Sequence, residues 1–137
     1  MVSKSEPLHW DCAKHGCFNQ KKRLKFSAFD GCLPGKISFT DLDGLVEVNG
    51  YFLFMEWKAH TEIPTGQRIL FERLTAFCPA TVLIVEGDAE TMEVRTLQQA
   101  WRGMFTERKE SSLEELRKHI TSWAEWAQKQ PRPYERN

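Results

Sequence analysis

The chain has 137 residues, of which 41% are hydrophobic and 12% aromatic, so it can bury the core of one domain and is not disordered throughout. Its 19 Lys and Arg residues balance 19 Asp and Glu residues, which excludes a protein that binds polyanions through net charge alone. The longest apolar run, Tyr51 to Met55, is too short to span a membrane, and the first residues lack the apolar stretch of a secretory signal. We therefore expect a cytoplasmic protein that does not enter a membrane.

Residues 1–36 combine Cys and His with a basic run and Gly/Pro punctuation, which predicts a loop-rich segment. In a reducing compartment its cysteines are free thiols or metal ligands rather than disulfides. Their spacing is not that of a standard zinc finger, so cysteines packed as small hydrophobic side chains remain the alternative to a structural zinc site. The candidate zinc ligands are Cys12, His15, Cys17 and Cys32.

No acid lies between Cys12 and Phe29, so positive charge is concentrated there although the whole chain is neutral. Such a run is typical of a surface that contacts nucleic-acid phosphates, and a solvated loop is the alternative. The same stretch predicts a short strand near Leu24–Phe29. The candidate nucleic-acid contacts are Lys21, Lys22, Arg23 and Lys25.

The clearest local signal is a β-hairpin, in which Leu45–Val48 and Tyr51–Lys58 are joined by Asn49-Gly50. That dipeptide accepts the positive φ that a type I′ turn needs at both positions. The second strand is apolar on both faces until Glu56, which is typical of a strand in the middle of a covered sheet.

Apolar residues at helical spacing predict a helix over residues 64–80. The apolar run Thr81–Val85 predicts a buried strand, and Gly87-Asp88 predicts the turn after it. Met92–Leu97 fits either a strand or the start of a short helix, and the pattern leaves residues 98–105 open.

Residues 111–129 predict the longest helix, with an apolar stripe along one side and prolines after its end. Ser111 and Glu114 have the spacing of a capping box at its start. The order of elements predicts a mixed α/β fold with a small central mixed β-sheet flanked by helices.

Glu56 and Lys58 lie two residues apart on the predicted central strand, so their side chains leave the same face. Counting outward from the two-residue turn, Asp43 lies opposite Glu56 and Asp41 lies opposite Lys58. Opposed carboxylates repel each other, and a divalent cation relieves the repulsion. Oxygen ligands suit Mg²⁺ or Mn²⁺, whereas a salt bridge that holds the sheet end together is the alternative.

Residues 40–58, TDLDGLVEVNGYFLFMEWK, resemble the core of the PD-(D/E)XK nuclease superfamily, in particular small phage and prophage nucleases and Holliday-junction-resolvase-like members. The resemblance implies a restriction-endonuclease-like core. It implies that Asp43, Glu56 and the backbone carbonyl of Trp57 bind divalent metal, and that Lys58 assists phosphodiester hydrolysis.

Two further positions bear on this resemblance. Leu42 stands where the superfamily motif has proline. Gln67 and Phe71 resemble the Q-x-x-x-Y feature of RecB-like relatives with the tyrosine replaced, and the resemblance makes Gln67 a catalytic-site candidate.

The resemblance implies a single nuclease-like domain over residues 1–137, with residues 37–97 as catalytic core and 98–137 as a C-terminal helical region. The predicted function is metal-dependent hydrolysis of DNA in a bacterial or phage-infected cell, by a chain that can dimerise through its aromatic last helix. One alternative is a catalytically silent nuclease fold that binds DNA or a host protein. Another is a zinc-stabilised interaction module in which the acid–lysine pairing is due to chance.

Overall fold

The computed structural model describes residues 24–60 and 62–134. By their internal contacts, residues 1–40 and 41–137 form two compact units, and each is described by itself. In the first unit, η1 (Phe26–Phe29) is a 3-10 helix, so the strand predicted near Leu24–Phe29 is wrong. The rings of Phe26 and Phe39 stack with centroids 5.6 Å apart, and this aromatic contact takes the place of strand pairing in the described part of the unit.

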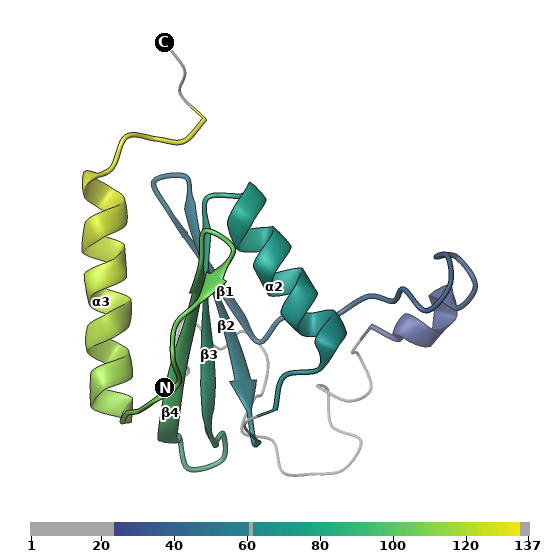
Figure 1. Cartoon of the computed structure of the whole chain (residues 1–137), viewed down its shortest axis with the longest axis horizontal. Helices are drawn as coiled ribbons and strands as arrows, with labels where there is room; N and C mark the ends of the chain where they lie inside the picture. Colours follow the sequence, from purple (N-terminus) through teal and green to yellow (C-terminus); the bar gives the residue numbers. More distant parts are fainter. Residues whose placement is uncertain (1–23, 61, 135–137) are drawn as a thin grey trace. The chain divides into compact units, whose positions relative to one another are not determined.

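The described residues of the second unit form a six-stranded mixed sheet (Figure 1). Its order is β1-β2-β3-β4-β5, with β6 also paired to β4. β2 and β3 are parallel, and the other pairs are antiparallel. The mixed α/β class is therefore confirmed. The strands are β1 (Gly44–Val48), β2 (Tyr51–Lys58), β3 (Ala80–Asp88), β4 (Glu93–Trp101), β5 (Met104–Phe105) and β6 (Lys109–Glu110).

The predicted hairpin is present, with Val48 opposite Tyr51 and a two-residue turn between them. Asn49 and Gly50 have φ of 55° and 87°, the positive values of a type I′ turn. β2 lies between β1 and β3, so the strand that is apolar on both faces is a central one, as predicted.

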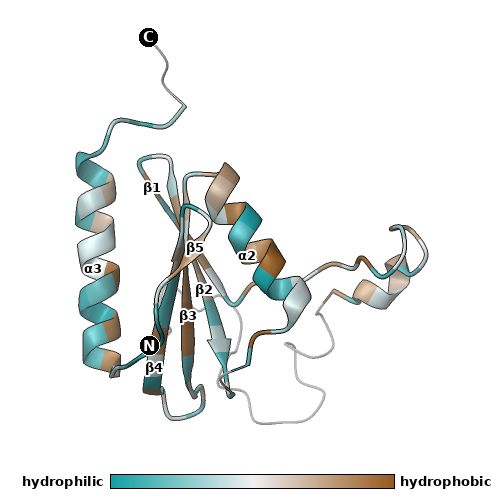
Figure 2. Ribbon diagram, viewed as in Figure 1, coloured by the Kyte–Doolittle hydropathy of each residue, from teal (hydrophilic) through white to brown (hydrophobic). Residues whose placement is uncertain are grey.

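The two helices of this unit, α2 (Thr65–Phe77) and α3 (Leu113–Lys129), cover opposite faces of the sheet (Figure 1). β3 separates two apolar clusters, because its successive side chains point to opposite faces. Leu83 and Val85 pack with α3 residues, whereas Val82 and Ile84 pack with Phe71 of α2. Figure 2 accordingly shows β3 as a hydrophobic strand between the two helices. No helix within residues 24–60 and 62–134 has the length and apolarity to cross a membrane.

The turn predicted at Gly87-Asp88 is wrong, because β3 continues to Asp88 through an irregularity between Glu86 and Gly87. Gly87 serves a close approach rather than a turn, since a Cβ there would collide with the carbonyl oxygen of Glu93. The chain reverses over residues 89–92 instead.

β4 settles the stretch that the sequence pattern leaves open, because it runs unbroken from Glu93 to Trp101. β5 and β6 follow it, so residues 98–110 are not helical and the expected C-terminal helical region begins only at α3. Both short strands pair with β4: β5 through a tight hairpin in which Trp101 lies opposite Met104, and β6 through the more distant pairs Thr96–Glu110 and Leu97–Lys109.

The N-cap of α3 lies one residue later than predicted. Ser112 Oγ accepts the backbone N–H of Glu115 at 3.2 Å, so Ser112, rather than Ser111, caps the helix. The backbone N–H of Ser111 instead donates to the carbonyl of Arg95 at 3.0 Å, which keeps Ser111 in the extended segment. Its side chain contacts Glu115 Oε2 at 3.3 Å, and the Ser111–Glu114 box is not formed.

We predict that Ser112→Ala lowers the free energy of unfolding by about 1 kcal/mol, because the Glu115 N–H loses its acceptor. Ser111→Ala is the matched control and is expected to change it by less than about 0.5 kcal/mol, as for an ordinary surface substitution. Urea unfolding followed by circular dichroism measures both. Equal losses in the two variants would contradict the assigned cap.

Candidate active site

The candidate site lies where β2 ends. The β1–β2 ladder ends with Gly44 opposite Met55, so Asp43 lies one residue before β1 and its predicted pairing with Glu56 stays a prediction. Phe54 packs in the cluster beneath α2, and side chains two residues apart share a face, so Glu56 and Lys58 face α2.

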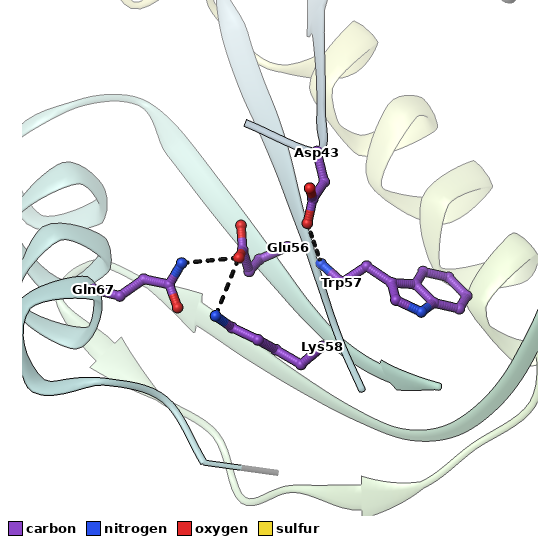
Figure 3. Close-up of polar contacts among 5 residues, drawn as sticks. All are labelled: Asp43, Glu56, Trp57, Lys58 and Gln67. Carbon is purple, nitrogen blue, oxygen red and sulfur yellow. Dashed lines mark hydrogen bonds and ion pairs between the residues drawn. The ribbon is translucent and has the colours of Figure 1, made fainter. Parts of the chain in front are cut away.

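Two side chains contact the Glu56 carboxylate (Figure 3). Gln67 Nε2 donates to Glu56 Oε1 at 2.8 Å, and Lys58 Nζ lies 3.3 Å from the same oxygen. Only 13% of the Glu56 side chain and 20% of the Lys58 side chain are exposed. The Glu56 carboxylate is thus partly desolvated, and the two contacts compensate the cost of its burial. Both contacts are made to Oε1, and neither involves Oε2.

The position of Gln67 follows from the connection between the parallel strands. α2 starts a few residues after β2 ends, so its first turn lies beside the end of that strand. Gln67 is in that turn, where the partial positive charge of a helix N-terminus also favours a nearby carboxylate.

Asp43 contacts the strand through its backbone. Asp43 Oδ2 accepts the backbone N–H of Trp57 at 2.8 Å. The backbone N–H and C=O of one strand residue point to the same side, so the Trp57 carbonyl faces the same edge as Asp43. The N–H of Phe52, an even-numbered residue, donates instead to Pro79 on the β3 side, which agrees with this alternation.

The Trp57 side chain points to the other face of the sheet. Its indole N–H donates to the carbonyl of Gly87 at 3.1 Å, and the ring packs against the cluster beneath α3. Core packing of this side chain, separate from its backbone carbonyl, is therefore confirmed.

Gln67 Oε1 has an unusual environment. It is buried and has no hydrogen-bond partner among the described residues. A buried acceptor without a partner is costly, so an amide oxygen in this position suits a cation or an ordered water. We name Asp43, Glu56, Lys58 and Gln67, with the Trp57 carbonyl, the oxygen-rich corner, because carboxylate, amide and carbonyl oxygens are the types that Mg²⁺ or Mn²⁺ binds.

Sequence reasoning missed Glu86, which the structure sets beside Lys58. Lys58 and Glu86 are register partners on parallel strands, so their side chains share a face. Glu86 Oε1 accepts from Thr96 Oγ1 at 3.0 Å, which orients it. The signal was present, because Glu86 is the first charged residue after an apolar strand, and the carboxyl ends of parallel strands share one edge.

The described part of the chain contains no group of three or more His, Cys, Asp or Glu residues arranged to hold a metal. Any metal at the corner would therefore depend on backbone and amide oxygens besides Asp43 and Glu56.

The predicted zinc site falls mostly outside the described residues. Cys12, His15 and Cys17 are outside them, and Cys32 is an exposed free thiol, so zinc stays a prediction. The predicted basic run also lies mostly outside the described residues. Lys25 is exposed, whereas Lys21, Lys22 and Arg23 are outside the described residues.

Comparison with known proteins gives no relative: no family model, no curated protein and no solved structure matches the chain. The function must therefore be argued from the corner itself.

The coupling between Glu56 and Lys58 can be measured with a double-mutant cycle using Glu56→Gln and Lys58→Met. We expect a coupling of about 1 kcal/mol in the free energy of unfolding, because both groups are partly desolvated. The exposed pair Glu114 and Lys118, with 3.5 Å between its charged atoms, is the matched control and should give about 0.3–0.5 kcal/mol. A coupling no larger than that of the control would mean that Glu56 and Lys58 do not interact as a desolvated pair.

Proposed function

We propose that the chain is a divalent-metal-dependent nuclease that hydrolyses phosphodiester bonds in DNA. The observation that carries the proposal is the oxygen-rich corner, where Glu56 contacts Lys58 and Gln67, and Asp43 accepts the backbone N–H of the next residue, Trp57. The resemblance of residues 40–58 to the PD-(D/E)XK superfamily assigns the same residues. The proposal also includes a cytoplasmic location, DNA as the partner, a phage or prophage origin and a homodimer.

Asp43, Glu56 and the Trp57 carbonyl would hold the metal. A bound Mg²⁺ or Mn²⁺ supplies Lewis-acid polarisation of the phosphate and a more acidic water. The unpartnered Gln67 Oε1 can accept a hydrogen bond from that water, while Gln67 Nε2 keeps Glu56 in place.

Lys58 would contribute charge rather than metal binding. Its ammonium group lies 3.3 Å from Glu56 Oε1 and is mostly shielded from solvent. A positive charge in a partly desolvated site stabilises negative charge that develops on a phosphate more strongly than it would in water. Backbone contacts to DNA are assigned to the basic run that ends at Lys25, and such contacts add affinity without sequence readout.

The purified chain is expected to nick or cut DNA when Mg²⁺ or Mn²⁺ is present. Glu56→Gln should reduce the rate at least about a hundredfold, because the charge that faces the metal is lost. Glu114→Gln, the same change at an exposed position on α3, should leave the rate unaltered. Gel assays on linear, branched, flapped and single-stranded DNA measure these rates, and an inert wild type on every substrate would refute the enzyme.

One observation favours the alternative, a nuclease fold that binds DNA or a host protein without turnover. Glu56 already has a positive partner in Lys58, and Asp43 already has a donor in the Trp57 N–H. Both carboxylates are therefore accommodated without a metal.

Titration calorimetry with Mn²⁺ separates the two functions. The enzyme is expected to bind Mn²⁺, and Asp43→Asn should weaken binding at least about tenfold while its amide oxygen still accepts the Trp57 N–H. A nuclease fold without catalytic activity would give no heat of Mn²⁺ binding with the wild type or with Asp43→Asn.

A further inference from the structure

A cavity of about 520 Å³ lies between α3 and the sheet, on the face opposite Glu56. A second cavity of about 340 Å³ shares three of its lining residues, Thr81, Trp101 and Trp126. We name the two together the tryptophan groove. Thr81, which lines both, is paired with Trp101 at the start of β3, whereas Lys58 is paired with Glu86 near its end. Five residues of strand separate these positions, or roughly 16 Å, so the groove is distinct from the candidate active site.

The groove presents aromatic faces at its opening. Trp101 and Trp126 are 38% and 37% exposed, which is high for such large apolar rings in partly enclosed positions. The ring of Tyr51 meets Trp126 edge-on with centroids 5.0 Å apart, which holds that indole in position. Partly exposed indoles are suited to stacking against a planar ligand, on Trp126 or on the side of Trp101 that the Arg102 guanidinium does not cover.

Polar groups line the interior. His119 Nε2 lies 2.7 Å from Gln99 Oε1, so a hydrogen-bonding pair faces the cavity. Trp123 Nε1 is buried without a hydrogen-bond partner among the described residues. A buried indole N–H normally has an acceptor, so an ordered water suits this position.

The charge at the opening favours an anion. The guanidinium of Arg102 lies 4.2 Å from the centre of the Trp101 ring, and Arg102 lines the smaller cavity. Its φ is 51°, a conformation that costs energy for arginine, and the next residue, Gly103, is tied to α2 by a hydrogen bond to Thr75 Oγ1. A turn that favours Asn or Gly thus carries a cation over an indole.

Lys118 lies on the wall of the larger cavity, where it forms an exposed ion pair with Glu114. Glu115 on the same wall is in contact with Ser111. A cationic ligand would meet Arg102 unfavourably, whereas the phosphates that follow a nucleobase along a strand would not.

We propose that the tryptophan groove binds unpaired bases of single-stranded DNA, with bases stacked on Trp101 and Trp126 and a phosphate near Arg102. Aromatic stacking combined with positive charge is the general means by which proteins hold single strands without reading their sequence. This site does not depend on the metal corner. Binding should persist when no divalent metal is present.

Fluorescence anisotropy of a labelled oligothymidine of about ten nucleotides, measured in EDTA, tests the proposal. Trp101→Ala and Trp126→Ala should each weaken binding about tenfold, and Trp101→Phe should retain most of it because a stacking face remains. Arg102→Gly should weaken binding and flatten its salt dependence, while the turn keeps a residue that favours positive φ.

Leu45→Ala is the control, because it truncates an exposed apolar side chain on β1, at the other side of the sheet from β4. It should bind as the wild type does, and circular dichroism checks that every variant is folded. Wild type that does not bind, or tryptophan variants that bind normally, would overturn the proposal. The proposal would also be overturned if the protein forms a concentration-dependent dimer that Trp126→Ala abolishes while this variant binds DNA as tightly as the wild type. The groove would then be an interface with a second copy of the chain.

Discussion

The two-residue turn at Asn49 and Gly50 sets the register of β1 against β2, and the place of Asp43 depends on that register. A slip of one residue would set Asp43 beside a β2 residue other than Trp57, whose backbone N–H it accepts. The turn is held from outside as well, since the Asn49 side chain donates to the carbonyls of Ala127 and Gln130 at 3.0 and 2.8 Å. The end of α3 thus helps to hold the β1–β2 register that sets Asp43 beside Trp57.

The corner also needs a sheet that is covered on both sides. β2 and β3 are parallel and lie between two apolar layers, so charged groups at their ends are partly removed from water. Partial desolvation strengthens the interaction of Glu56 with Lys58 and Gln67, and it makes each of them costly without the others. Such an arrangement contributes little net stability, because the cost of desolvating the charges offsets their attraction.

Local patterns predicted the elements, whereas the errors arose where a distant contact decides the outcome. The hairpin, its register and the Glu56–Lys58 face follow from a dipeptide and a period of two. The cap moved to Ser112 because Arg95, on another strand, binds the Ser111 backbone. The sequence pattern predicts a turn at Gly87, because the close contact of Gly87 with Glu93 cannot be seen from its neighbours in sequence. Glu86 joins the corner only once parallel pairing is known.

Trp57 links three strand ends through two N–H groups. Its backbone N–H binds Asp43 before β1, and its indole N–H binds Gly87 at the irregular part of β3. The indole belongs to the apolar layer beneath α3, yet the same residue orients a carboxylate at the sheet edge. Substitutions in the apolar layer beneath α3 would therefore shift Asp43 through Trp57, without changing any charged side chain of the corner.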